Sequence, residues 1–296
     1  MNGVRSTEDR LPESDEIDRV PVRRAVEILH EAERAVDAAI GPALPAIAEL
    51  AEAAAAALAA GGRLIYVGSG TSGRLGALDA AECPPTFGVE PDRVLAILAG
   101  GPEAMTRAVE GAEDDPVAGA RAVREAGAGP TDVVVGISAS GRAAFVRGAL
   151  EEAGRLGARR ALVPTHPPPE GAPAEIVGAA LGGPEPIAGS TRLKSGTATK
   201  RILNMVSTAA MIRLGKVYRN LMVDVVPTNE KLRRRARRIV SEVLGVAEPE
   251  ADRLLAAAGR PSPVKVAIVM GRLGVGAPEA RRRLDEAGGF LHRILG

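Results

Sequence analysis

The chain has 296 residues, which suits one large domain or two smaller ones, and 46% of them are hydrophobic, as in an ordinary globular protein. A net charge of +1 and an aromatic content of 2% argue against a nucleic-acid partner, because neither a strong positive field nor a set of stacking rings is encoded. The single cysteine, Cys83, excludes an internal disulfide, and the three histidines are too far apart in sequence to suggest a metal site.

The first 20 residues are polar and acidic, and they predict a flexible lead-in rather than a secretory signal, which would need an apolar stretch. No run of about 18 apolar residues follows in the sequence, so we expect neither a transmembrane helix nor a membrane partner. Together with the single cysteine, these features favour a cytoplasmic protein.

Residues 21–60 predict helices, with apolar residues at helical spacing and a break at Gly41–Pro42. Beyond them, four short β-rich runs alternate with four helical patterns. The β-rich runs cover residues 63–68, 93–101, 131–138 and 159–165, and the helical patterns cover 74–81, 104–111, 117–126 and 143–156. Such alternation predicts an α/β fold with a parallel sheet and right-handed crossovers.

The remaining sequence predicts a loop and a long helix over residues 190–214, one more strand over 220–228, and then short helices broken by Gly and Pro. We therefore divide the chain into a lead-in (1–20), a main domain with its N-terminal helices (21–229) and a small C-terminal helical module (230–296). A basic run near the start of that module fits a solvated helix face better than a nucleic-acid site, because the net charge is near neutral.

The first β-rich run leads into a loop whose glycines have the spacing G-x-G-x-x-G. A dinucleotide-binding loop of this type requires an acidic residue at the end of the second strand, and the second β-rich run ends in Ala-Gly-Gly instead. The residues between the glycines are hydroxylic. Hydroxyls and backbone N–H groups at a helix N-terminus suit the terminal phosphate of a monoester. The predicted phosphate-binding residues of this loop are Ser69, Thr71 and Ser72.

Two further hydroxyl-rich stretches follow. Ser138 and Ser140 come directly after the third β-rich run, and Ser190, Thr191 and Lys194 precede the long helix. Open α/β sheets bind ligands at the carboxyl ends of their strands, so we expect the loops after the first and third β-rich runs to form one phosphate site, with the third stretch as a further hydroxyl-rich candidate. Ordinary helix capping by Ser or Thr is the alternative for each stretch alone.

Two glutamates could supply acid–base chemistry. Glu82 follows the first phosphate-type loop and its helix, and Glu113 follows the second β-rich run. Paired carboxylates in a partly desolvated pocket can divide into an acid and a base, because burial and mutual repulsion separate their pKa values. On the residues alone, solvated acids at helix ends are the alternative.

Long stretches of the sequence resemble the N-acetylmuramic acid 6-phosphate etherases, of the sugar isomerase (SIS) fold family. The resemblance extends from about residue 17 to the C-terminus. The matching motifs are GRLIYVGSGTSGRLGALDAAECPPTFGV, AVEGAEDD, DVVVGISASGR, GSTRLKSGT and GGFLHRIL. The resemblance implies a three-layer αβα parallel-sheet SIS fold.

It also implies a lyase without cofactor or metal, which converts N-acetylmuramic acid 6-phosphate into N-acetylglucosamine 6-phosphate and D-lactate during recycling of cell-wall amino sugars. In the family, the glutamate of the EC motif acts as the proton donor and that of the GAED motif acts as the base. These glutamates correspond to Glu82 and Glu113 here. The family further implies a homodimer.

Two other functions remain open at this point. Another SIS enzyme, such as an aldose–ketose isomerase, would share the phosphate loops but would release no lactate. A non-catalytic sugar-phosphate sensor would bind the same class of ligand and would tolerate the loss of both glutamates. The presence of the acidic pair favours an enzyme.

Overall fold

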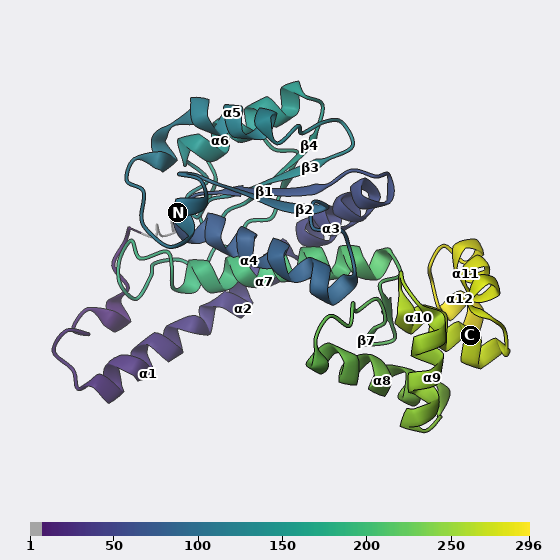
Figure 1. Ribbon diagram of the computed structural model, residues 1–296. Helices are drawn as coiled ribbons and strands as arrows, with labels where there is room; N and C mark the ends of the chain where they lie inside the picture. Colours follow the sequence, from purple (N-terminus) through teal and green to yellow (C-terminus); the bar gives the residue numbers. More distant parts are fainter. Residues whose placement is uncertain (1–7) are drawn as a thin grey trace. The chain divides into compact units, whose positions relative to one another are not determined.

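The computed structural model describes residues 8–296 (Figure 1). The first seven residues of the predicted lead-in lie outside this description, and the rest of it contains one short 3-10 helix, Pro12–Ser14. The chain forms two compact units. One comprises the residues up to Ala81 together with Asp92–Ser207, and the other comprises Glu82–Pro91 and Thr208–Gly296.

The predicted N-terminal helices are confirmed. α1 (Val22–Glu33) and α2 (Ala35–Ile40) precede a 3-10 turn at the predicted break, and α3 (Leu44–Ala59) follows. By length and composition alone the stretch Val22–Ala59 could cross a membrane, but half of its most apolar window is buried inside the protein. α3 contacts β1, β3 and β5 of the sheet, as a core helix does.

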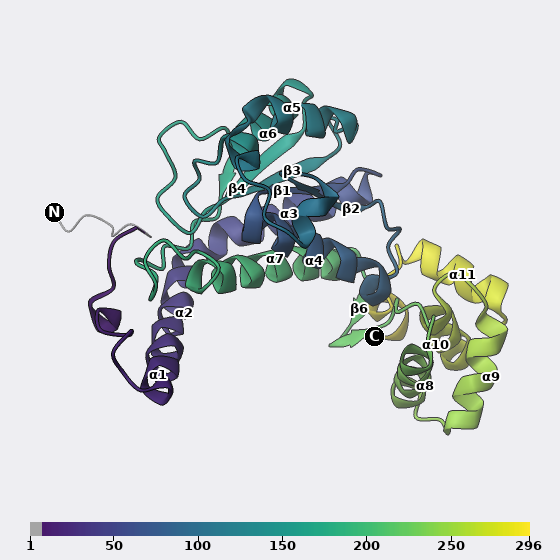
Figure 2. The same cartoon turned by 60° about the vertical axis from the view of Figure 1, so that its left-hand side comes forward.

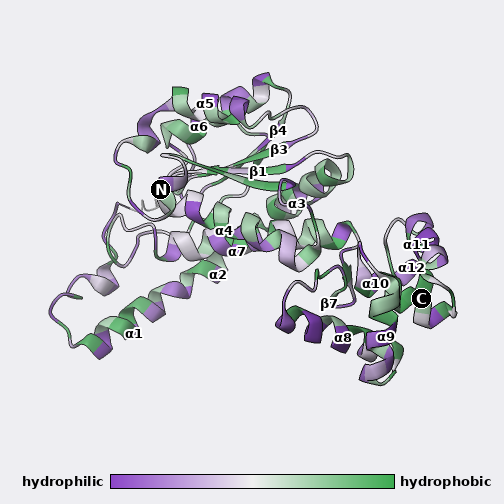
Figure 3. Ribbon diagram, in the orientation of Figure 1, coloured by the Kyte–Doolittle hydropathy of each residue, from purple (hydrophilic) through white to green (hydrophobic). Residues whose placement is uncertain are grey.

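A five-stranded parallel sheet forms the centre of the first unit, with the strand order β2-β1-β3-β4-β5. All residues of β1 and β3 are buried, and Figure 3 shows these strands as hydrophobic, as expected when helices cover both faces of a sheet. The four predicted strands are confirmed, and a short fifth strand joins them. The strands are β1 (Leu64–Gly68), β2 (Val94–Leu98), β3 (Val133–Ile137), β4 (Arg159–Val163) and β5 (Ile176–Val177).

Helices cover both faces of this sheet (Figures 1 and 2). α5 (Pro116–Glu125) and α6 (Ala144–Arg155) pack together on one face, and α3, α4 (Gly70–Phe87) and α7 (Lys194–Arg213) lie on the other. The expected three-layer αβα architecture is therefore confirmed. α4 is longer than predicted, because the helix continues through Pro84 and Pro85.

A buried hydrogen-bond network holds α4 in place beneath the sheet. The Tyr66 hydroxyl of β1 donates to one carboxylate oxygen of Asp79 on α4, at 2.8 Å. The Asn204 amide and the Ser207 hydroxyl of α7 donate to the other oxygen, at 2.7 and 3.1 Å. Because the Asp79 carboxylate is buried, loss of the donors to either oxygen would leave that oxygen poorly satisfied. The network thereby fixes the position of α4 relative to β1 and α7.

The segment after β2 differs from the sequence prediction. We predicted a helix over residues 104–111, but the structure has two 3-10 helices, Pro102–Met105 and Ala112–Asp114, with an irregular loop between them. The Arg74 guanidinium donates to the carbonyl oxygens of Ala104 (2.8 Å) and Arg107 (3.0 Å). The helix prediction was therefore wrong, and these two hydrogen bonds help to hold the loop in its irregular path.

The second unit contains a small hairpin and a set of helices. The strand predicted over residues 220–228 is only two residues long, because β7 (Leu221–Met222) pairs with β6 (Val217–Tyr218) and the chain then leaves the hairpin. The residues after β7 enter the helical core rather than a sheet. The helices are α8 (Glu230–Leu244), α9 (Glu248–Ala258), α10 (Pro263–Leu273), α11 (Ala277–Glu286) and α12 (His292–Leu295).

An ion cluster lies inside this second unit. The Asp224 carboxylate is 2.6 Å from the Lys265 ammonium and 3.2 Å from that of Lys216. Asp224 and Lys265 are both buried. Burial lowers the pKa of Lys265, and the neighbouring Asp224 opposes that shift.

Candidate functional site

The sheet has a topological switch point between β1 and β3. The chain passes from β1 to β2 on one side, and β3 lies on the other side of β1, so the loops after β1 and β3 diverge. Such a divergence leaves a crevice at the carboxyl ends of the two strands, where α/β proteins bind ligands. The loop at residues 69–72 follows β1, and the loop at residues 138–143 follows β3.

A polar pocket of about 430 Å³ lies at this edge. Seven of the ten predicted site residues line it, namely Ser69, Thr71, Ser72, Glu113, Ser138, Ser140 and Thr191. The structure thus brings together the hydroxyls of all three predicted stretches and one of the two glutamates. The other lining residues are Glu8, Gly70, Asp114, Ala139, Arg142, Ala143 and Gly189.

Glycines let β1 and α4 approach each other closely at the pocket. A Cβ atom on Gly68 would lie 2.7 Å from the backbone nitrogen of Gly73, and a Cβ on Gly73 would lie 2.6 Å from the Gly68 carbonyl oxygen. Gly70 has a φ of +49°, which disfavours residues with a side chain. The glycine spacing therefore serves a tight strand-to-helix turn, and the hydroxyls between the glycines face the pocket at the α4 N-terminus.

Glu113 reaches this turn from the 3-10 helix Ala112–Asp114. The Ser69 hydroxyl donates to the Glu113 carboxylate at 3.1 Å, which links the loop after β2 to the loop after β1. Both residues line the same pocket. A carboxylate is therefore placed beside the predicted phosphate-binding hydroxyls, where it can exchange a proton with a bound sugar.

Three charged residues of the pocket, Glu8, Asp114 and Arg142, were not among the site residues predicted from the sequence. Arg142 follows Ser140, and its backbone N–H donates to the Ser140 hydroxyl at 3.2 Å, which holds the loop after β3. Glu8 lines the pocket from the N-terminal segment, where a polar acidic sequence gave no signal of a site. The guanidinium of Arg142 is the positive charge among the described lining residues.

A buried histidine, His166, lies in the electrostatic neighbourhood of these residues. Burial lowers the pKa of its imidazole, Glu8 raises it and Arg142 lowers it. The loop after β4 that carries His166 hydrogen-bonds through Thr165 to the Ala139 carbonyl of the pocket loop, at 3.0 Å. His166 therefore lies next to the pocket loop but does not line the pocket itself.

Lys194 and Ser190 do not line the pocket. The Lys194 ammonium donates to the Gly182 carbonyl at 2.9 Å, and its side chain is buried. The backbone N–H groups of Lys194 and Ser195 donate to the buried Glu185 carboxylate at 3.0 and 2.9 Å. Burial lowers the pKa of Lys194, and Glu185 raises it. The N-terminus of α7 is thus already occupied by a carboxylate of the chain itself.

Glu82 also does not line the pocket. It lies on α4 twelve residues beyond Gly70, and twelve residues of α-helix span about 18 Å. Its side chain is exposed. The structure therefore does not bring the second predicted glutamate into the lining of this pocket.

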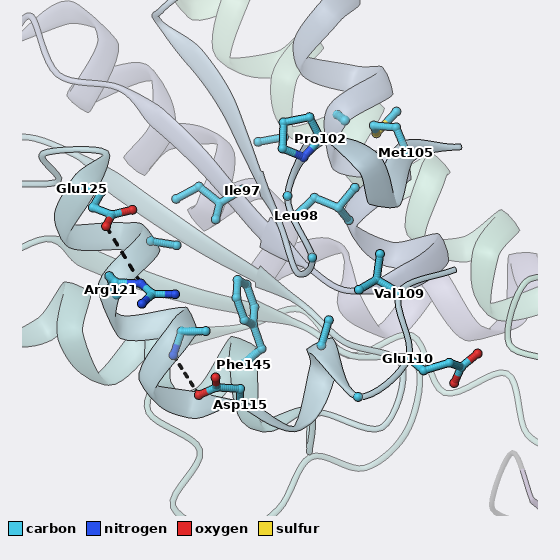
Figure 4. Close-up of a pocket in the computed structure, with 18 residues that line it drawn as sticks. Ile97, Leu98, Pro102, Met105, Val109, Glu110, Asp115, Arg121, Glu125 and Phe145 are labelled. Atoms are coloured by element: carbon cyan, nitrogen blue, oxygen red, sulfur yellow. Dashed lines mark hydrogen bonds and ion pairs between the residues drawn. The ribbon is translucent and has the colours of Figure 1, made fainter. Parts of the chain in front are cut away.

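A larger cavity of about 700 Å³ lies beside the edge strand β2 (Figure 4). Its walls are mainly apolar and include Ile97 and Phe145. Among its charged residues, Asp115 caps the N-terminus of α5, and Arg121 pairs with Glu125 at 3.9 Å. Because its walls are mainly apolar and its one arginine is already paired, the polar pocket is the better candidate for a sugar phosphate.

Within residues 8–296, no group of three or more Cys, His, Asp or Glu side chains has a geometry that could hold a metal ion.

Comparison with known proteins gives the family. Residues 46–153 match the model of the glucokinase regulatory protein N-terminal SIS domain. The chain is 49% identical to the N-acetylmuramic acid 6-phosphate etherase of Cutibacterium acnes over 98% of its own length and 95% of the relative's. It is 46% identical to the etherase of Pectobacterium atrosepticum over 99% and 96% of the two lengths.

Among solved structures, the chain resembles the c3406 protein of E. coli CFT073, with a TM-score of 0.51 and 19% identity. The match covers 67% of this chain and 93% of the other, and it supports the fold. The etherase relatives, in contrast, match over nearly the whole chain. The chain belongs to the N-acetylmuramic acid 6-phosphate etherase family.

Proposed function

We propose that this protein is a carbon–oxygen lyase that cleaves the D-lactyl ether of N-acetylmuramic acid 6-phosphate. The products are N-acetylglucosamine 6-phosphate and D-lactate. The observation that carries this proposal is a pocket in which phosphate-type hydroxyls surround a carboxylate, in a chain that is 45–49% identical to etherases over nearly its full length.

The phosphate group binds at the start of α4 and at the loop after β3. Ser69, Thr71 and Ser72 offer hydroxyls and the N-terminal N–H groups of α4, and Ser138 and Ser140 offer hydroxyls from the other side of the switch point. Arg142 adds a permanent positive charge that can pair with the phosphate dianion. Thr191 supplies a further hydroxyl. Ser190 and Lys194 lie on the same segment as Thr191 but do not line the pocket, so their contribution to phosphate binding would be indirect, through Thr191.

The reaction begins with removal of a proton. In the open-chain sugar the C1 aldehyde acidifies the proton on C2, and Glu113 removes it as general base. The electron pair forms the C2–C3 double bond, and the bond from C3 to the lactyl oxygen breaks. Glu82 donates a proton to the departing lactate oxygen. The products of this step are an α,β-unsaturated aldehyde and D-lactate.

Water then adds to the same double bond. A water molecule attacks C3 with the loss of one proton to a glutamate, and C2 receives a proton from the other glutamate. The sum of both steps is replacement of the lactyl ether by a hydroxyl. The sugar C2 therefore carries a proton from solvent in the product.

We also propose the metabolic role, the cellular compartment and the oligomeric state of this enzyme. The substrate is a fragment of cell-wall sugar, so the enzyme serves amino-sugar and peptidoglycan recycling, and its single buried cysteine suits the reducing cytoplasm. We propose a homodimer as the working form.

Release of D-lactate in D₂O tests the function. Wild-type protein should release D-lactate from N-acetylmuramic acid 6-phosphate and should place deuterium on C2 of the amino sugar. Glu113→Gln should lower the rate by about 10²–10⁴-fold, the usual contribution of a positioned general base. Glu110→Gln, in the same loop but outside the polar pocket, is the matched control and should retain activity. Binding of the sugar phosphate without lactate release would point to an isomerase or a sensor instead.

A further inference from the structure

The polar pocket contains a carboxylate that the proposed reaction does not use. Glu8 lines the pocket together with the hydroxyls at the start of α4 and after β3. It belongs to the N-terminal segment, residues 8–20, which is anchored a short way after Glu8. There the buried Ser14 side chain donates its hydroxyl to the Leu11 carbonyl at 3.0 Å. The approach of Glu8 to the pocket is therefore supported by an ordered turn of the same segment.

Glu8 lies at the rim of the pocket rather than at its floor. The residue is exposed, whereas Ser138 of the loop after β3 is only 5% exposed. A Cβ atom on Gly189 would lie 3.0 Å from a Glu8 carboxylate oxygen, so this carboxylate rests against the backbone just before Thr191. Glu8 is also close enough to His166 to raise the pKa of that imidazole. These contacts place Glu8 on the side of the pocket that the Thr191 segment forms.

The charges of the pocket argue against a contact between Glu8 and a bound phosphate. Arg142 is the one cation among the described lining residues, and Glu8, Glu113 and Asp114 are acidic. A carboxylate and a phosphate dianion repel each other at contact distance. The phosphate is favoured instead where N–H groups and hydroxyls gather, at the start of α4. Glu8 is thus left for a part of the ligand that carries no charge.

The uncharged part of an amino-sugar phosphate is rich in hydrogen-bond donors. Its hydroxyls lose hydrogen bonds to water on binding, so they need acceptors in the site. The serine and threonine hydroxyls of the pocket are proposed to donate to the phosphate, which leaves the carboxylates as the strongest acceptors. A carboxylate offers about four acceptor positions, so Glu8 can accept from a sugar beside any contact that it makes with its own chain.

We propose that Glu8 is a substrate-binding residue whose carboxylate accepts hydrogen bonds from the hydroxyl groups of the amino sugar at the rim of the pocket. The N-terminal segment is then a part of the binding site, and it makes the site prefer a sugar phosphate to a bare phosphate. The inference rests on the proposed function for the identity of the sugar. Its test is a comparison of binding constants, which does not require the lyase reaction.

Isothermal titration calorimetry with inorganic phosphate and with N-acetylglucosamine 6-phosphate tests the role of Glu8. Glu8→Ala should weaken binding of the sugar phosphate by about 10-fold, the lower end of the range for a hydrogen bond to a charged group, because the rim is open to solvent. Inorganic phosphate should bind equally well or more tightly, because a nearby negative charge is removed. Glu8→Gln keeps an acceptor oxygen and should weaken sugar-phosphate binding less than Glu8→Ala does.

Glu16→Ala is the matched control. Glu16 belongs to the same N-terminal segment, its side chain is 75% exposed, and it does not line the pocket, so neither binding constant should change. Unchanged binding of the sugar phosphate by Glu8→Ala would overturn the proposal. Tighter binding of both ligands would also overturn it and would identify Glu8 as an internal competitor of the phosphate. Equal weakening of both ligands would overturn it too, because the effect would then lie in the phosphate site.

The lactate assay adds a kinetic measurement. Glu8→Ala should raise KM with little change in kcat, because the lost hydrogen bonds are made equally in the bound substrate and in the transition state. If the wild-type protein releases no lactate, the etherase proposal fails, while the two binding constants still decide the role of Glu8.

Discussion

At the scale of single residues, Ser69 contacts the proposed base Glu113. The Ser69 hydroxyl donates to the Glu113 carboxylate at 3.1 Å and also lies at the N-terminus of α4, where the phosphate is proposed to bind. In the proposed mechanism, Ser69 therefore orients the base with respect to the phosphate. Ser72 lines the same pocket, but no hydrogen bond to Glu113 is described for it.

Ser69→Ala should consequently lower kcat as well as raise KM. A hydrogen bond to a charged group is worth about 1.5–3 kcal/mol, so we expect kcat/KM to fall by about 10- to 100-fold. Ser72→Ala should raise KM with a much smaller effect on kcat, because it removes a phosphate donor and leaves Glu113 oriented. Steady-state kinetics of lactate release separates the two. Equal changes in kcat for both variants would contradict the positioning role of Ser69.

At the scale of elements, the N-terminus of α7 depends on a residue that is distant from it in sequence. The Glu185 carboxylate is fully buried and accepts hydrogen bonds from the N–H groups of Lys194 and Ser195. It also opposes the burial of the Lys194 ammonium. The segment that carries Thr191 into the pocket is therefore anchored by this cap.

Glu185→Ala should destabilise the protein by about 2–4 kcal/mol, because it leaves two buried N–H groups without an acceptor. Glu175→Ala is the control. Its partner Arg160 forms an ion pair at the surface, and the Glu175 side chain is 44% exposed, so the loss should stay near 1 kcal/mol or below. Urea unfolding followed by circular dichroism measures both. A Glu185→Ala variant as stable as the control would show that the cap contributes little.

The ion cluster of the second unit predicts an asymmetry between two variants. Asp224→Asn leaves the buried Lys265 ammonium without its counter-charge and should cost about 3–5 kcal/mol. Lys265→Met should cost less, because Lys216 still neutralises Asp224. The free energy of unfolding for each variant checks this order.

The pH dependence of the same pair has a definite sign. Burial lowers the pKa of Lys265 in the folded state below its ordinary value of 10.5, so the unfolded chain binds that proton more tightly. Stability rises with pH wherever the unfolded state holds more protons. The stability of wild type relative to Lys265→Met should therefore increase as the pH rises through the folded pKa toward 10.5. A constant difference across this range would contradict the shift.

The sequence predicted the strands and most helices because their apolar periodicity reflects local burial. The helix predicted over residues 104–111 was wrong, and Arg74, thirty residues earlier, donates to two carbonyls of the irregular loop found there, a contact that no local pattern reveals. The hydroxyls of the loops after β1 and β3 were predicted because they directly follow buried strands. Glu8 was missed, because its approach to the pocket depends on the path of the N-terminal segment rather than on a local pattern.

At the scale of the whole molecule, Leu78 on α4 is a large apolar side chain that is 51% exposed, and we expect it to contribute to the proposed homodimer interface. Leu78→Glu should therefore weaken the homodimer. Val117→Glu, at the more exposed Val117 of α5, is the control and should remain dimeric. Analytical ultracentrifugation measures the oligomeric state of both variants, and an unchanged Leu78→Glu dimer would contradict this expectation.

The length of α4 has a further consequence for how the chain unfolds. The helix begins in one compact unit, which ends at Ala81, and continues into the other, which begins at Glu82. Because a helix melts cooperatively, melting of either half should fray the other, and the two units should lose their structure in one transition.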